Sequence, residues 1–217
     1  MKPFVFLNFK TYEQGTGDNA FKLTNIAEEA ALEGNVELAI IAQVVDIRML
    51  ARNSKLKIFA QHADLDSYGA HTGKVTIEAL KQAGAAGIML NHSENRISMD
   101  LVKRMVKRCK ELEMPVLVCV ANLKEAKEVL KLKPEYLALE DPKLIGSGKS
   151  ITEYKPDEVL KFVELVKGKA VALCGAGISS SVDFIKALEM GNDGVLLASA
   201  YVKSDNPKEM LFKFLGI

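Results

Sequence analysis

Eight short apolar runs recur along the chain, and longer segments lie between them. The runs cover residues 4–9, 37–42, 57–61, 87–91, 115–120, 136–140, 170–174 and 194–198. Continuous apolar residues, rather than alternating ones, are typical of parallel strands that are buried on both faces. Eight strands in 217 residues leave about 27 residues for each unit, close to the minimum for a strand–helix–strand repeat. The pattern predicts an α/β protein with a parallel sheet.

Amphipathic segments between these runs predict the helices. One apolar stripe at helical spacing extends from Ile97 to Leu112, with Ser98 as a candidate N-cap and Asp100 in the first turn. Helices are also predicted over residues 124–132, 156–166, 182–190 and 206–215. No linker rich in Pro or Ser and no block of like charges interrupts the chain, so residues 1–217 are predicted to form one domain.

Two architectures alternate parallel strands with helices: an open, doubly wound sheet and a closed barrel. Eight units of nearly equal length, with no GxGxxG motif after the first strand, favour the closed (β/α)8 TIM barrel. This choice also locates the chemistry, because polar residues at the carboxyl ends of barrel strands face a common mouth.

Polar side chains follow several of the predicted strands. Asn8 and Lys10 end the first strand and are two residues apart, so they point the same way from an extended chain. His92 follows the fourth strand and Glu140 the sixth. A charge directly after a buried strand is costly unless it is paired or used in function. Taken singly, each residue also has a structural interpretation: Glu140 as an acid at a helix start, His92 as a packed histidine, and Lys10 as a surface lysine.

The polar segments match one family in order along the chain. They are Asn8-Phe9-Lys10, Gly69-Ala70-His71-Thr72-Gly73, His92-Ser93-Glu94 and the segment from Glu140-Asp141-Pro142 to Ile145-Gly146-Ser147-Gly148. Each motif is weak alone, but together they resemble the triosephosphate isomerase family over the whole chain. His62 and His71 are interpreted as structural histidines.

The resemblance implies an aldose–ketose isomerase of glycolysis and gluconeogenesis that interconverts dihydroxyacetone phosphate and D-glyceraldehyde 3-phosphate without a cofactor or metal. By the same resemblance, Glu140 is the base, and His92 is a neutral electrophile beside a helix N-terminus. Asn8 and Lys10 contact the substrate, and Glu94 pairs with Lys10. Phosphate binding is expected from the segment 141–147, which would act as a lid, and from the last two strand ends, through the amides of Gly146, Gly177, Ala198 and Ser199. Ile145 is expected to contact the substrate.

Some features depart from the commoner family pattern. The chain is shorter than the roughly 250 residues typical of such barrels, and the expected lid lacks a Trp. The seventh strand leads into Cys174-Gly175-Ala176-Gly177-Ile178, and the eighth ends in Ala198-Ser199. These features look like the compact archaeal branch of the family. Two rival interpretations remain: another phosphate-binding barrel isomerase, and a barrel that only senses sugar phosphates.

The charge balance indicates which partners to expect, and the cysteines indicate the compartment. A net charge of +1 gives no basic surface for nucleic acid or membrane, and neither a signal peptide nor a membrane span is expected. Cys109, Cys119 and Cys174 are widely spaced and form no metal-binding motif. They are expected to be buried thiols of a cytoplasmic protein.

A homo-oligomer is also expected. The segment Gly69–Gly73 resembles a loop that docks into a neighbouring subunit. Shortened helices and the apolar C-terminal residues 210–217 suggest uncovered apolar surface, which is typical of partner interfaces. A tetramer is therefore favoured, with a dimer as the second choice.

Overall fold

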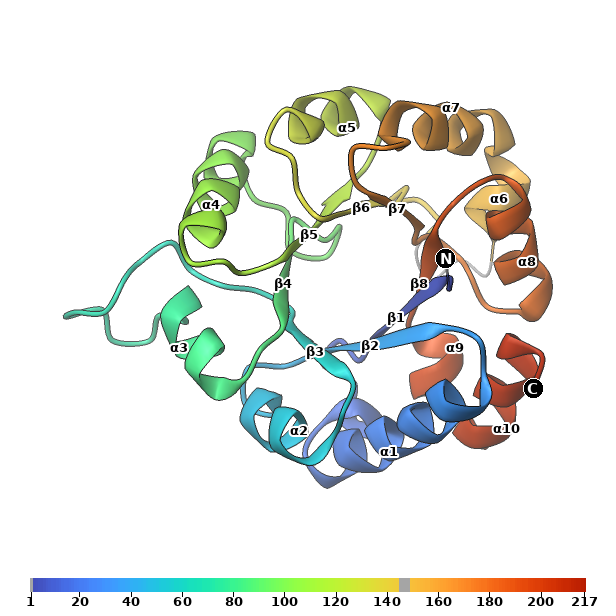
Figure 1. Cartoon of the computed structure of the whole chain (residues 1–217), viewed down its shortest axis with the longest axis horizontal. Coiled ribbons are helices and arrows are strands. Elements are labelled where there is room, and N and C mark those ends of the chain that lie inside the picture. Colours follow the sequence, from blue (N-terminus) through green and yellow to red (C-terminus); the bar gives the residue numbers. More distant parts are fainter. Residues whose placement is uncertain (1, 145–148) are drawn as a thin grey trace.

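Eight parallel strands close into a barrel inside a ring of helices (Figure 1). The computed structural model describes residues 2–144 and 149–217. Each strand pairs with its sequence neighbours, and β8 returns to β1. The strands are β1 (Phe4–Asn8), β2 (Glu37–Ala42), β3 (Lys57–Ala60), β4 (Gly87–Leu90), β5 (Val116–Val120), β6 (Tyr136–Leu139), β7 (Val171–Cys174) and β8 (Gly194–Leu197). The predicted strands and the predicted closed barrel are thus confirmed, and no strand end differs from its prediction by more than one residue.

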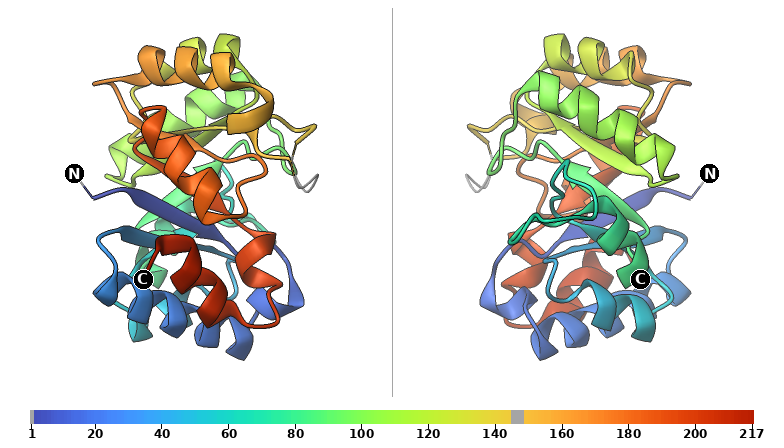
Figure 2. Two further views of the ribbon diagram at one scale, coloured as in Figure 1. Left: turned by 90° about the vertical axis from the view of Figure 1, so that its right-hand side faces the viewer. Right: turned by 90° about the vertical axis from the view of Figure 1, so that its left-hand side faces the viewer.

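Helices follow the strands and form the outer layer. The five helices predicted from the sequence are present as α4 (Met99–Glu111), α5 (Leu123–Leu130), α7 (Pro156–Val166), α8 (Ser181–Glu189) and α10 (Pro207–Leu215). The sequence analysis did not predict α1 (Asp18–Glu33), α2 (Ile47–Asn53), α3 (Ile77–Ala83), α6 (Ile151–Tyr154), α9 (Ser199–Val202) or the 3-10 turn η1 (Glu13–Gly15). Side views show the helices flanking the strands (Figure 2). In the described parts of the chain, no helix is both long and apolar enough to cross a bilayer.

Aromatic side chains fill the interior of the barrel. Phe6 packs edge-on against Phe59 and Tyr136, with ring centroids 5.2 and 5.1 Å apart. Gly87 leaves room for this cluster, because a Cβ there would lie 2.2 Å from the Phe59 ring. Burying each such ring stabilises the fold by about 1.5–3 kcal/mol. Since β1 and β6 begin at Phe4 and Tyr136, these rings lie toward the amino ends of the strands, and the polar residues lie at the opposite mouth.

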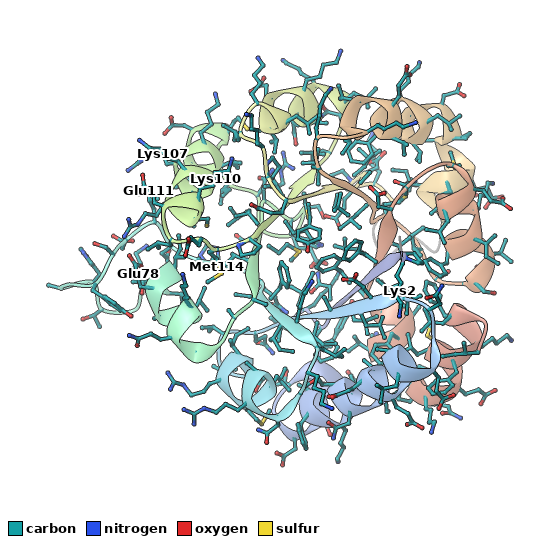
Figure 3. The ribbon with its side chains drawn as sticks, viewed as in Figure 1. Lys2, Glu78, Lys107, Lys110, Glu111 and Met114 are labelled. Carbon is teal, nitrogen blue, oxygen red and sulfur yellow. The ribbon has the colours of Figure 1, made fainter. Side chains whose placement is uncertain are left out.

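Local chemistry fixes where the helices start. Ser98 accepts a hydrogen bond from the N–H of Leu101, so the predicted N-cap of α4 is confirmed. Ser180 and Asp183 form a capping box at α8. Between neighbouring helices, Arg108 of α4 pairs with Glu78 of α3 and with Glu111 of its own helix. These charges lie at the rim of the molecule, where Figure 3 labels Glu78 and Glu111.

The three cysteines are free and buried, as expected. Burial raises the pKa of the Cys109 thiol to about 12, so this side chain behaves as a small apolar group. The expectation for the C-terminal segment was wrong. Leu211 and Phe214 are buried, Phe214 stacks on Phe184 of α8, and α10 packs against α1 and α8. Apart from Ile217, which is 43% exposed, the large apolar residues of this segment pack into or against the core instead of forming an exposed patch.

Candidate active site

A polar cleft of about 240 Å³ opens at the carboxyl ends of the strands. Residues from β1, β4, β6, β7 and β8 or the loops after them line it. They are Asn8, Lys10, Tyr12, His92, Glu140, Gly175, Gly177, Ile178, Ser179, Leu196, Leu197, Ala198 and Ser199. Segments far apart in the sequence thus meet at the one mouth of the barrel.

The end of β1 holds Lys10 in a defined place. The backbone of Lys10 is in the left-handed region with φ 48°. The Oδ1 atom of Asn8 accepts the Lys10 N–H at 2.9 Å, and the Nε2 of Gln61 donates to the Lys10 carbonyl at 2.7 Å. The Nζ of Lys10 lies 2.6 Å from the Oε1 of Glu94. With only 13% of its side chain exposed, Lys10 is a fixed cation at the mouth and not a surface lysine.

His92 presents its Nε2 atom to Glu140. Its Nδ1 accepts a hydrogen bond from the N–H of Glu94 at 3.2 Å, so in this arrangement the proton of a neutral ring sits on Nε2. That Nε2 lies 3.4 Å from the Oε1 of Glu140. The expectation that His92 lies beside a helix N-terminus was wrong, because the following helix, α4, begins only at Met99 behind its Ser98 cap. A backbone amide in the same turn selects the tautomer instead.

Glu140 is a buried carboxylate at the end of β6. Its backbone N–H donates to the Val120 carbonyl, and 3% of the residue is exposed. The next helix in the described chain begins at Ile151, so Glu140 is not an acid at a helix start. Its Oε2 has no hydrogen-bond partner among the described residues. Burial and the neighbouring Glu140 charge raise the pKa of the Cys119 thiol well above its ordinary value. A buried carboxylate oxygen left without a partner suits a group that takes up a proton.

Gly175 and Gly177 shape the wall of the cleft beside Glu140. A Cβ on Gly175 would lie 2.8 Å from the Cγ of Glu140 and 3.0 Å from its Oε1. Gly177 has φ +71°, and a Cβ there would lie 1.9 Å from the Lys149 carbonyl oxygen. The sequence analysis missed Gly175, although its position two residues before Gly177 is where a close backbone approach could be suspected.

We expect Gly175→Ala to lower kcat by about 10-fold or more, because small displacements of a reacting group carry large kinetic costs. Steady-state kinetics would test this, and a thermal melt would show whether the fold is kept. In the Glu140→Asp background, whose side chain is one methylene shorter, the same change should cost less. An unchanged kcat in Gly175→Ala would show that Glu140 tolerates the added methyl.

The structure brings most of the predicted site residues together. Asn8, Lys10, His92, Glu140, Gly177, Ala198 and Ser199 all line the cleft. Glu94 lines an adjoining hollow with Gln61, His62 and Asn95. Ile145, Gly146 and the rest of 145–148 lie outside the described residues, so three of the seven residues of the expected lid, 145–147, are among them. Sequence reasoning also missed Tyr12, Ile178 and Ser179, which carry no distinguishing motif.

Within residues 2–144 and 149–217, no cluster of three or more His, Cys, Asp or Glu side chains is arranged to hold a metal ion.

Comparison with known proteins assigns the chain to a family. The family model "Triosephosphate isomerase" matches residues 3–215. The chain is 40% identical over 213 residues to a triosephosphate isomerase of Methanothermus fervidus, covering 97% of this chain and 96% of that protein. It is 38% identical over 217 residues to that of Methanocaldococcus jannaschii, with 97% and 99% covered, and 37% identical over 216 residues to that of Archaeoglobus fulgidus, with 98% and 97% covered. A barrel with this cleft and these full-length matches belongs to the triosephosphate isomerase family.

Proposed function

We propose that Glu140 and His92 carry out the proton transfers of triose phosphate isomerisation, with Lys10 and Asn8 holding the substrate. The reaction interconverts dihydroxyacetone phosphate and D-glyceraldehyde 3-phosphate, as the family assignment states. The observation that supports these roles is the approach of the His92 Nε2 to the Glu140 Oε1, 3.4 Å apart in a cleft that also holds Lys10.

In the proposed mechanism, Glu140 removes a proton from the carbon next to the substrate carbonyl. The Nε2–H of His92 donates to the carbonyl oxygen as it gains negative charge, which gives an enediolate. Glu140 then returns the proton to the adjacent carbon, while His92 exchanges the proton between the two oxygens. No electron is gained or lost overall, so the chemistry needs no redox partner.

Lys10 supplies the positive charge of the proposed site. The substrate phosphate and the developing oxyanion are both negative, and a fixed cation stabilises them without reorganising during the reaction. Glu94 holds the Lys10 ammonium, and Asn8 holds its backbone. We further propose that the amides of Gly177, Ala198 and Ser199 bind the phosphate, since the last two loops of such barrels often do so and these residues line the cleft.

The proposed route is tested by solvent exchange. In D₂O, the purified protein should convert glyceraldehyde 3-phosphate to dihydroxyacetone phosphate with deuterium appearing on the carbon that receives the proton, as followed by NMR. Turnover should persist after treatment with a chelator, because the proposed steps use only protein groups. Conversion without any deuterium entering the product at any stage would contradict a base that exchanges with solvent.

We also propose a compartment and a pathway for the protein. All three cysteines are unpaired and buried, which supports a reducing compartment such as the cytoplasm. The reaction belongs to glycolysis, and its reversibility supports a role in gluconeogenesis as well.

The chain is proposed to form a homo-oligomer, with a tetramer favoured over a dimer. The segment before α3 extends beyond the ring of helices (Figure 1), and its residues 67–74 are exposed. Tyr68 in this segment is 58% exposed, which supports a first interface there. Val182 and Ile185 on α8 are 70% and 54% exposed and lie three residues apart on one helix face, which supports a second interface.

We expect sedimentation equilibrium to give the mass of a tetramer at micromolar protein. Replacing Val182 and Ile185 together by Lys should reduce the assembly to a dimer with kcat retained, because both side chains are exposed and neither lines the cleft. A stable, active monomer of the unmodified chain would contradict both interfaces.

A further inference from the structure

The residue before His92 has an unusual backbone for a side-chain-bearing residue. Asn91 has φ 62°, in the left-handed region that Asn tolerates better than most residues. It directly follows β4, and 3% of it is exposed. Other non-glycine residues with positive φ, such as Glu113 and Lys133, are exposed turn residues. Asn91 therefore combines a left-handed turn with a buried polar side chain.

Both ends of the Asn91 carboxamide are hydrogen-bonded to backbone. The Nδ2 donates to the carbonyl of Cys119 in β5 at 2.9 Å. The Oδ1 accepts the N–H of Ile97, two residues before α4, at 3.2 Å. The turn that carries His92 is thus attached on one side to the barrel wall and on the other to the approach of the following helix.

The hydrogen bond from the Asn91 side chain to the Cys119 carbonyl replaces a backbone hydrogen bond that a longer β4 would make. In the β4–β5 ladder, the Ile88 N–H donates to the Pro115 carbonyl, and Leu90 is in register with Val118. Bonds in a parallel ladder are evenly spaced at two-residue steps, so two further steps would give the Cys119 carbonyl the backbone N–H of His92. Instead, β4 ends at Leu90, and the Asn91 side chain donates to that carbonyl. The strand can therefore end before His92 without leaving a buried carbonyl unsatisfied.

Two successive carbonyls of β5 then hold the two groups proposed to act on the substrate. The Cys119 carbonyl holds Asn91, next to His92, and the Val120 carbonyl accepts the backbone N–H of Glu140. Successive carbonyls along a strand point to opposite neighbours. The strand β5 is thus bonded to the turn of His92 and to the backbone of Glu140, whose Nε2 and Oε1 atoms lie 3.4 Å apart.

We infer that Asn91 is a positioning residue for His92, whose buried carboxamide ties the His92 turn to β5 and aims its imidazole at Glu140. This inference rests on the role proposed above for His92. It assigns to Asn91 no contact with the substrate. Removing the carboxamide should therefore affect the step in which His92 acts and leave phosphate binding unchanged.

The first test is Asn91→Gly, which permits the left-handed backbone and removes both hydrogen bonds. We expect kcat to fall about 10- to 100-fold, the cost of a displaced reacting group, with KM changed by less than about 3-fold. The affinity for inorganic phosphate should be unchanged. Lys133→Gly, at an exposed residue with φ 52°, is the matched control and should keep wild-type kcat.

A second variant separates the two hydrogen bonds. Asn91→Asp keeps an acceptor for Ile97 but places a carboxylate oxygen opposite the Cys119 carbonyl. If the bond to β5 positions His92, this variant should lose kcat at least as strongly as Asn91→Gly. Nitrogen-15 NMR of the imidazole should show the Nε2–H tautomer of His92 in the wild type and a mixture of tautomers in both variants. An unchanged tautomer and an unchanged kcat in both variants would overturn the inference.

A double-mutant cycle distinguishes failure of this inference from failure of the proposed function. In a His92→Ala background, Asn91→Gly should cost little further kcat, because the residue it positions is gone. If Asn91→Gly lowers kcat as much in the His92→Ala background as in the wild type, Asn91 supports the cleft by another route, and the inference alone is overturned. If His92→Ala itself keeps wild-type kcat, the role proposed for His92 fails, and the inference falls with it.

Discussion

Glu140→Gln is expected to lower kcat about 10²- to 10⁴-fold while leaving the fold intact, the usual share of a positioned general base. The amide has the same shape as the carboxyl group, so the close contact with Gly175 is preserved. It cannot accept a proton from carbon, because its lone pairs are far less basic than those of a carboxylate. The loss should therefore fall on kcat, with the affinity for inorganic phosphate close to that of the wild type.

Glu135→Gln is the matched control for this substitution. Glu135 directly precedes β6, whereas Glu140 directly follows it, so the two carboxylates lie at opposite ends of one strand. The Oε2 of Glu135 accepts the N–H of Val116, and a Gln oxygen can keep that bond. We expect wild-type kcat for this variant. Near-wild-type turnover in Glu140→Gln, with substrate and product measured directly, would remove Glu140 from the proposed role.

The barrel could be predicted from the sequence because its strands are buried on both faces. Such strands are continuous apolar runs, and each predicted strand matches the structure to within one residue. The amphipathic helices α4 and α7 were also predicted from their apolar spacing, and in α4 the start signal Ser98 agrees with it. The four-residue helices α6 and α9 were missed, because so short a helix contains barely one turn of periodicity.

The site could be predicted only in part, because its geometry depends on which strands become neighbours. Sequence order places His92 and Glu140 after the fourth and sixth strands, but only the closed barrel brings their side chains to 3.4 Å. The sequence interpretation attributed the neutral His92 ring to a helix N-terminus, whereas the structure shows the Glu94 N–H at Nδ1. Asn91 gave no sequence signal, since its partner Cys119 is 28 residues away and offers only a backbone carbonyl.

The role proposed for His92, a hydrogen-bond donor to the substrate carbonyl oxygen, predicts a specific effect of His92→Ala. A donor to the carbonyl oxygen matters most as charge develops, so its removal should lower kcat about 10²- to 10³-fold and change KM little. Glu140 would also lose its contact with the His92 Nε2, which lies 3.4 Å from its Oε1. Any rise in the activity of Glu140 as a base would offset only part of the loss, because the oxyanion would still lack its donor.

Binding experiments can separate this role from simple support of the cleft. In His92→Ala, an analogue of the enediolate that carries a phosphate should lose far more affinity than inorganic phosphate, because only the analogue places an oxyanion at the Nε2 position. Titration calorimetry on both ligands measures the difference. His92→Gln, whose amide can still donate a hydrogen bond from a similar position, should recover part of kcat and part of the analogue affinity. If His92→Ala weakens both ligands equally, the imidazole only holds the cleft together, and the donor that stabilises the enediolate must come from Lys10 or Asn8.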